Sequence, residues 1–180
     1  YYSQATSEQG SDFAIHAASN STIKDNLIYD CNFNNGGIRG AIFVGNDSNV
    51  SGNTILNCNG SGIIIEGSNV MIYNNNLNVS QYGIYSYGNY SNITIELNVI
   101  DSNNASAIHL EKQSRTLFPH DITIQINVLY SNSNDGAIYI DEVCTNIQVY
   151  NTFIVGVSGN INENTHSLFS FDIFPSPKES

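Results

Sequence analysis

A nine-residue phrase recurs six times along this chain and constrains its fold more than any other feature. The phrase has Asn or Asp first, Ile or Val fourth, usually Asn seventh, and Ile or Leu ninth. Its copies begin at Asn20, Asp47, Asn69, Asn92, Asp121 and Asn146, in steps of 27, 22, 23, 29 and 25 residues. An internal period of this length is typical of a solenoid, in which each repeat buries its apolar face against the next.

A second phrase lies between the copies of the first and consists of Gly or Ala followed by Ile and alternating apolar residues. It begins at Ala14, Ala41, Gly62, Gly83, Ala107 and Ala137. Each repeat therefore contains at least two short strands separated by Asn, Gly and Ser turns, and no segment has helical spacing. We expect an all-β fold in which each strand pairs in parallel with its copy about 4.8 Å away. Such a fold is a parallel β-helix, here of about six rungs, where a rung is one complete turn of the coil.

Together the two phrases resemble the repeats of right-handed parallel β-helices of the pectate-lyase-like superfamily, over roughly residues 13–159. The resemblance implies a single-stranded right-handed β-helix. That superfamily contains polysaccharide lyases, glycoside hydrolases, uronate epimerases, phage tailspikes and non-catalytic surface proteins, so it implies no single chemistry. The Asn-rich composition is also similar, more weakly, to archaeal cell-surface proteins, including the disaggregatase-related regions of methanogens.

The chain divides into two parts by this pattern. We expect residues 1–159 to form the rungs, and residues 160–180, which include the alternating apolar segment 168–174, to form a strand that caps the solenoid or pairs with a partner. No signal peptide opens the chain, which suggests a segment of a longer protein. Possible partners therefore include neighbouring domains of that protein or further copies in a homo-oligomer.

Charge excludes some functions. The formal net charge is -11 with only five Lys and Arg, so we expect no nucleic acid partner, because binding needs several phosphates neutralised. No run of 18 apolar residues exists, so we expect no membrane span. Recurring Asn-x-Ser/Thr triplets favour a secreted or cell-surface location.

The seventh position of the first phrase stacks one column of amides along the coil. Its members are Asn26, Asn53, Asn75, Asn98 and Asn127, with Thr152 last. Stacked amides can bond along the column and satisfy turn backbone, so we interpret them as a scaffold without chemistry. The same alignment places Cys31 and Cys58 on adjacent rungs, where we expect buried, reduced thiols.

The second phrase places aromatic residues and acids on one outer face. One outward stripe contains His16, Phe43, Ile64, Tyr85, His109 and Tyr139, and a parallel stripe contains Glu66, Tyr87, Glu111 and Asp141. Aromatic faces beside carboxylates suit sugar rings, so we expect Tyr85, Tyr87, His109 and Tyr139 to bind a polysaccharide. Alternatively, these aromatic residues merely suit strands, or a loop or a neighbouring subunit covers them.

Three carboxylates are candidate catalytic residues. Glu111 and Asp141 fall on successive rungs, about 5 Å apart, which resembles a retaining glycosidase pair. Glu66 lies two rungs from Glu111, near the upper limit for an inverting pair. Close carboxylates raise one another's pKa, which would leave one of the first two protonated. The same cluster with Glu142 could instead hold Ca²⁺, or it could be a chance acidic patch.

The longest step contains a segment, residues 111–120, that must leave the coil as a loop. It carries Lys112 and Arg115, two of the five cations. Loops beside a rigid sheet often carry function, so we also expect these two residues to contact the polysaccharide. Arg115 could bind a uronate carboxylate, lie near the α-proton in a lyase reaction, or form a simple salt bridge. The tail of the loop resembles part of the Asp-Pro-His motif of mannuronan C5-epimerases, but Phe118 replaces the Asp, which argues against epimerase chemistry.

Two functional hypotheses follow from these features. The first is an extracellular domain that binds and degrades a polysaccharide as a hydrolase or lyase, with no cofactor or with Ca²⁺. The second is a non-catalytic adhesin, fibre or spacer module of a cell surface.

Overall fold

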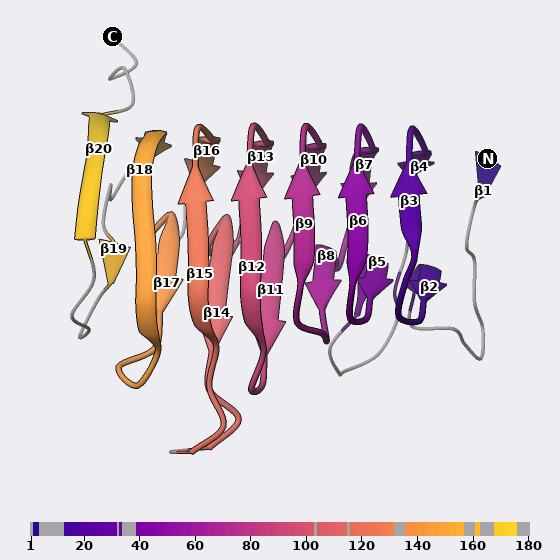
Figure 1. Cartoon of the computed structure of the whole chain (residues 1–180). Helices are drawn as coiled ribbons and strands as arrows, with labels where there is room; N and C mark the ends of the chain where they lie inside the picture. Colours follow the sequence, from indigo (N-terminus) through magenta and orange to yellow (C-terminus); the bar gives the residue numbers. More distant parts are fainter. Residues whose placement is uncertain are drawn as a thin grey trace, which may run out of the picture.

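The computed structural model describes residues 2–3, 13–31, 33, 39–102, 104–114, 116–131, 136–156, 161–162 and 168–175. The described chain forms short parallel strands and no helix, wound into a right-handed solenoid of about five turns (Figure 1). The predicted right-handed parallel β-helix is therefore confirmed. Among these residues no helix is long and apolar enough to cross a membrane.

Three columns of strands make up the solenoid, and we name them faces A, B and C. Face A contains β3 (Thr22–Lys24), β6 (Ser48–Ser51), β9 (Val70–Tyr73), β12 (Ser91–Glu96), β15 (His120–Gln125) and the first half of β18 (Thr145–Gly156). Face B contains β1 (Tyr2–Ser3), β4 (Leu27–Tyr29), β7 (Thr54–Cys58), β10 (Asn76–Val79), β13 (Val99–Ser102), β16 (Val128–Ser131) and the second half of β18.

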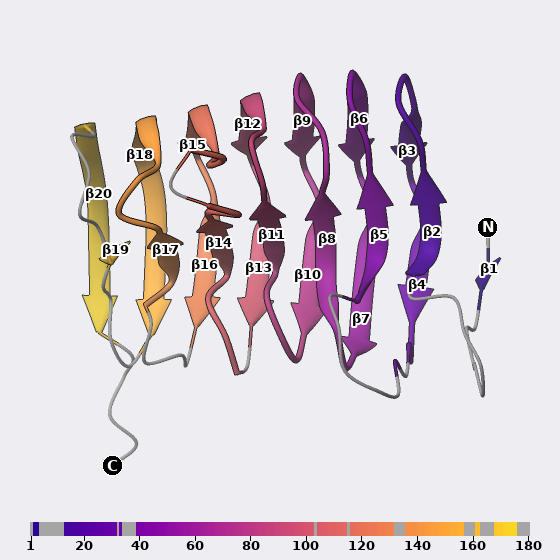
Figure 2. The same ribbon diagram turned by 90° about the horizontal axis from the view of Figure 1, so that it is seen from below.

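Face C is a separate sheet of seven strands. It contains β2 (Phe13–Ala17), β5 (Gly40–Val44), β8 (Ser61–Ile65), β11 (Ile84–Tyr87), β14 (Ile108–Glu111), β17 (Ile138–Ile140) and β19 (Ile161–Asn162). Figure 1 looks onto face A, and the view from below in Figure 2 brings face C forward. The two phrases of the sequence thus have separate places: the first covers faces A and B, and the second forms face C.

The core is built from inward-facing aliphatic side chains stacked in register. On face A, Ile95 lies between Ile72 and Ile124 on the neighbouring strands, and all three are fully buried. Equivalent stacks line the inside of faces B and C. Burial of these stacked apolar side chains is the main contribution to the stability of the fold. The chain can therefore fold although it has few charged residues.

Corners between faces C and A explain the first residue of the nine-residue phrase. Its six copies, Asn or Asp, have positive φ angles between 52° and 59°. Asn and Asp enter the left-handed region more easily than other residues with a side chain, so the corner selects them. The corner between faces A and B repeats this conformation at Asp25, Gly52, Asn74, Leu97, Ile126 and Asn151.

The predicted amide ladder is confirmed at this second corner. Asn98 donates its side-chain Nδ2 to Asn127 Oδ1 at 3.1 Å and to Ile72 O at 3.0 Å, and it accepts the backbone N–H of Asn75 at 3.0 Å. The same pattern links the other Asn residues of the column, which are buried from Asn53 onward. Each side chain therefore binds two rungs together and satisfies buried backbone groups.

Two further sequence expectations concern the cysteines and the end of the chain. Cys31 and Cys58 are buried and free, as expected, and Cys144 is buried and free as well. Strand β20 (Leu168–Pro175) pairs in parallel with β18 over Gln148–Gly156 and so extends the sheet of faces A and B. The division at residue 160 and the role of the last segment as a cap or partner-pairing strand stay predictions.

Candidate functional site

An aromatic cluster lies on the outer side of face C, and we define it as Tyr82, Tyr85, Tyr87, His109 and Tyr139. His109 stacks on Tyr139 with ring centroids 4.3 Å apart and an interplanar angle of 10°. Tyr85 stacks on Tyr82 at 4.9 Å and on Tyr87 at 6.4 Å. The cluster forms because parallel pairing places β11, β14 and β17 side by side, so that Tyr85, His109 and Tyr139 fall in register.

Burial divides the cluster into an inner and an outer part. Tyr85 and His109 are only 5% and 6% exposed, whereas Tyr82, Tyr87 and Tyr139 are half-buried. The predicted outward stripe is therefore not uniform, since Tyr85 and His109 are packed among the other rings. A ligand on this face would contact Tyr82, Tyr87 and Tyr139 first. At the other end of the stripe His16 is exposed and Ile64 is buried.

Glu111, at the end of β14, is the acid most closely joined to the aromatic cluster. Its Oε2 accepts a hydrogen bond from the Tyr85 hydroxyl at 2.7 Å and lies 3.7 Å from His109 Nε2. The Glu111 side chain remains 40% exposed. Burial, and then the hydrogen bond to Glu111, raise the pKa of Tyr85 well above its ordinary value, so Tyr85 remains a neutral donor. Glu111 thus combines a fixed position with an oxygen that solvent or a ligand can reach.

Asp141 has a different set of contacts. It follows β17 and its side chain is only 9% exposed, with Oδ1 2.9 Å from Lys112 Nζ. Lys112 also lies 3.1 Å from Glu142 Oε1. Hydrogen bonds to Asp141 and then to Glu142 raise the pKa of Lys112. Glu111 and Asp141 are on successive rungs, as the repeat predicts, but one carboxylate is held by Tyr85 and the other by Lys112.

This arrangement bears on the two roles predicted for the acid cluster. A retaining pair needs two carboxylates directed at one reacting sugar, and the contact with Lys112 engages Asp141 instead. For Ca²⁺, no group of three His, Cys, Asp or Glu side chains suited to a metal ion occurs among the described residues. The ammonium group of Lys112 bridges Asp141 and Glu142, two of the three acids expected to bind the cation. The Ca²⁺ site stays a prediction.

The remaining predicted site residues lie at the edges of this region. Glu66 follows β8 and is exposed, and the register of β8 with β11 puts it beside Tyr87, two rungs from Glu111. Arg115 lies outside the described residues. The connection between β14 and β15 projects beyond the other turns (Figure 1) and contains an antiparallel bridge between Ser114 and Leu117. His120 lies in β15, and its Nδ1 is 2.9 Å from Asp121 Oδ2.

Sequence reasoning missed Tyr82, which packs against both Tyr85 and His109. Its ring centroid is 4.9 Å from that of Tyr85 and 4.3 Å from that of His109. Tyr82 precedes β11 and lies outside both repeated phrases, so the repeats did not indicate that it belongs to the site. Only its position directly before the Gly83-Ile84 phrase could have suggested that it packs beside the strand.

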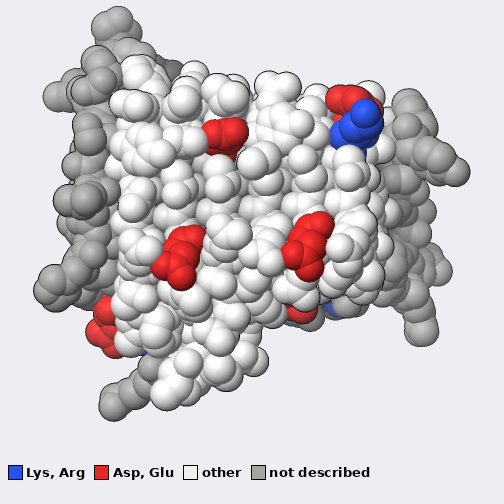
Figure 3. Space-filling model, in the orientation of Figure 1, with Lys and Arg blue, Asp and Glu red and all other residues white. Residues whose placement is uncertain are grey.

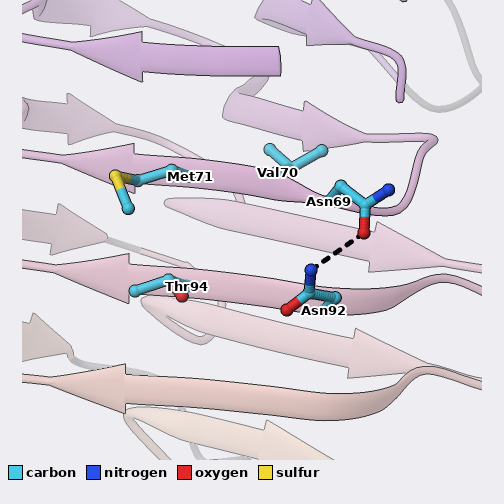
Figure 4. A pocket seen from close by; sticks show the side chains of 5 residues that line it. All are labelled: Asn69, Val70, Met71, Asn92 and Thr94. Atoms are coloured by element: carbon cyan, nitrogen blue, oxygen red, sulfur yellow. Dashed lines mark hydrogen bonds between the residues drawn. The ribbon is translucent and has the colours of Figure 1, made fainter. Parts of the chain in front are cut away.

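Face A offers little chemistry by comparison. Figure 3 shows it as a broad surface with a few isolated charged groups. Asn69, Val70, Met71, Asn92 and Thr94 line a shallow depression on it (Figure 4). Asn92 donates its Nδ2 to Asn69 Oδ1 at 2.8 Å there, a contact between corners of successive rungs. None of the five residues carries a titratable side chain, so we assign no catalytic role to this depression.

Comparison with known proteins agrees with the architecture. No curated protein and no solved structure matches the chain significantly. A family described as "Right handed beta helix region" matches residues 2–124 and 35–154, which together cover most of the chain and include the strands of the aromatic cluster. The protein therefore belongs to the right-handed β-helix family.

Proposed function

We propose that this protein binds a polysaccharide along face C, over the aromatic cluster and Glu111. The observation that carries the proposal is the contact between Tyr85 and Glu111, which fixes a partly exposed carboxylate beside three half-buried tyrosine rings. Aromatic faces pack against the apolar faces of sugar rings, and a carboxylate accepts hydrogen bonds from sugar hydroxyls. We include in this proposal a place in the pectate-lyase-like superfamily and a secreted or cell-surface location.

Charge favours a neutral glycan over a polyuronate. Glu66, Glu111 and Glu142 are all at least partly exposed along this face, and the chain has a formal net charge of -11. Lys112, the cation nearest to the cluster by sequence, already binds Asp141 and Glu142. A uronate polymer would therefore approach like charge without a described cation available to neutralise it.

Cleavage of the bound glycan is the second candidate function, and Glu111 is its best-supported acid. Tyr85 and His109 hold this carboxylate in place, and a positioned carboxyl group within reach of a glycosidic oxygen can act as a general acid or base. The engagement of Asp141 by Lys112 makes the Glu111–Asp141 pair a weaker basis for a retaining mechanism than the repeat alone suggested. We therefore propose binding as the primary function.

The test is binding to a panel of neutral polysaccharides and to polygalacturonate, measured by affinity electrophoresis and calorimetry. Variants Tyr139→Ala and Glu111→Gln should weaken binding to a neutral polymer at least about tenfold, which corresponds to about 1.4 kcal/mol. Glu96→Gln on face A is the control, because Glu96 contacts Gln125 far from the cluster. Equal binding by all variants, or no binding to any polymer, would remove the proposal and favour a spacer or adhesin module.

Cleavage is measured on the same samples. New reducing ends that disappear in Glu111→Gln would establish hydrolysis or elimination at this site, and ultraviolet absorbance of an unsaturated product would identify elimination. If reducing ends persist in Glu111→Gln and vanish in Asp141→Asn, the catalytic assignment of Glu111 is wrong.

A further inference from the structure

Cys31 and Cys58 occupy equivalent positions on the first two complete rungs of the solenoid. Cys31 follows β4, and Cys58 is the last residue of β7. Hydrogen bonds on both sides fix their register: Asn57 Nδ2 donates to Asp30 Oδ1 at 3.3 Å, and Asn59 N donates to the Cys31 carbonyl at 3.0 Å. The two cysteines therefore stack directly on one another across the step between the rungs.

Other rungs fill this position without cysteine. Strand pairing places Val79 beside Cys58, and Ser102 beside Val79. Ser131 follows on the next rung, and all of these side chains are buried. Packing of the core therefore does not require cysteine at this position. Its occurrence on two successive rungs points to a role for the pair.

We propose that Cys31 and Cys58 form a reversible disulfide that fastens the first rung to the second. A disulfide needs Cα atoms about 4.4–6.8 Å apart, and neighbouring strands lie about 4.8 Å apart. Its Cβ atoms must lie about 3.5–4.5 Å apart, so the stacked side chains have to approach by about 1 Å at most. The first rung has room for this shift, because β2 and β3 are the terminal strands of their sheets.

The position of the pair also gives an oxidant access to it. Both thiols are fully buried, so the reaction begins with a local opening of the first rung. The end of a solenoid opens more easily than its middle, because a terminal rung has a neighbouring rung on one side only. Figure 1 shows β3 and β4 at the N-terminal end. Cys144, the third cysteine, lies just before β18 near the opposite end.

The reaction is a thiol–disulfide exchange with a small disulfide oxidant such as oxidised glutathione. The Cys31 thiolate attacks one sulfur of the oxidant and releases one glutathione thiolate. The Cys58 thiolate then attacks the Cys31 sulfur of the mixed disulfide and releases the second one. Each cysteine loses one proton, and two electrons pass to the oxidant. A hydrogen bond between the two thiols lowers the pKa of Cys31 and raises that of Cys58, which favours Cys31 as the first nucleophile.

The disulfide should stabilise the N-terminal end of the solenoid. It would close a loop of 58 − 31 = 27 residues, and a cross-link of this length restricts the unfolded chain. We expect the melting temperature to rise by at least about 3 °C after allowance for some strain. Disulfides persist in oxidising compartments, so the secreted or cell-surface location proposed above is the setting in which the pair would be oxidised.

Oxidation of the native full chain with oxidised glutathione tests the proposal. Free thiols, counted after alkylation in denaturant, should fall from three to one. Trypsin cleaves after Lys24, Arg39 and Lys112, so a non-reducing digest should contain residues 25–39 joined to residues 40–112. Dithiothreitol should separate these peptides and reverse the rise in melting temperature. The assay requires no glycan, so its outcome is independent of the proposed polysaccharide binding.

Three single variants provide the controls. Cys58→Ser, which carries the residue of other rungs, should keep its remaining thiols and show no melting shift with the oxidant, and Cys31→Ser should behave in the same way. Cys144→Ser should form the disulfide like the wild type. The proposal is wrong if the native wild type keeps all its thiols, if the disulfide joins other peptides or two chains, or if it forms without raising the melting temperature. An equal melting shift in Cys58→Ser would also contradict it.

Discussion

Replacing Asn98 by Ala should lower the free energy of unfolding by about 4 kcal/mol, although the side chain touches no proposed ligand site. Asn98 is fully buried in the middle of the amide ladder. Without its side chain, the buried Asn75 backbone N–H loses its partner at 3.0 Å, and the Ile72 carbonyl and the Asn75 side-chain Nδ2 each lose one hydrogen bond of 3.0 Å. A buried group left unpaired costs about 1–3 kcal/mol and a lost hydrogen bond about 1 kcal/mol, and the cavity adds to this.

Asn26→Ala provides a matched comparison at the first rung of the same ladder. Asn26 is half-buried and acts there as a donor, to Lys24 O at 3.0 Å and to Asn53 Oδ1 at 2.9 Å. Its backbone N–H keeps its bond to Asn53 Oδ1 after the substitution. The expected loss is therefore about 1 kcal/mol, the net contribution of an ordinary hydrogen bond.

Urea unfolding followed by circular dichroism measures both variants, and amide hydrogen exchange locates the change. A total stability of about 5–15 kcal/mol is usual, so Asn98→Ala should remove a large part of it. Exchange should accelerate at Asn75 and on the rungs beside it, because each rung contacts only its neighbours. If Asn98→Ala and Asn26→Ala unfold within about 0.5 kcal/mol of each other, the ladder does not stabilise the solenoid in the way described.

Two further predictions concern packing and pH. Gly67→Ala should destabilise the protein by about 3 kcal/mol in the same urea assay, because the added Cβ would lie 2.3 Å from Asn46 N and 2.4 Å from Gly45 C. Gly45→Ala should have a clearly smaller effect, because its Cβ would meet backbone atoms only at 3.1 Å. Equal losses of stability in the two variants would contradict the steric argument. Because the folded pKa of Tyr85 is raised, its contribution to stability is complete below the unfolded pKa of about 10 and is lost as pH rises above that value. Tyr85→Phe should therefore lose less stability than the wild type between about pH 9 and pH 11, and an identical loss in both proteins would refute this linkage.

The sequence predicted the architecture because each fold-determining position recurs. The Asn at the seventh position of the phrase had to satisfy the same backbone groups in every rung, and the structure confirms this from Asn26 to Asn127. The first Asn or Asp of the phrase recurs for a second reason, its positive φ angle, which the sequence pattern alone did not reveal.

The candidate site was harder to predict because its decisive contacts run across the repeat. The register placed Glu111 next to Asp141, but it could not show that Lys112, at the start of the long loop, binds Asp141. His109 packs against Tyr82, which lies outside both phrases. A side chain that occurs only once in a repeat protein has no equivalents in the other rungs, so the repeat does not predict its contacts. Lys112 and Tyr82 are such side chains, and they distinguish this site from the rest of the solenoid.

The amide ladder also gives the solenoid a direction. From Asn26 to Asn98 every side-chain Nδ2 donates to the Oδ1 of the next rung toward the C-terminus, ending at Asn127, so these amide dipoles point the same way. Hydrogen bonds aligned head to tail polarise one another. One end of such a column exposes an acceptor and the other a donor, so rungs can be appended head to tail but not head to head. Lengthening this protein by duplicating a repeat therefore requires no new contacts, whereas inverting a repeat would place two amide oxygens against each other.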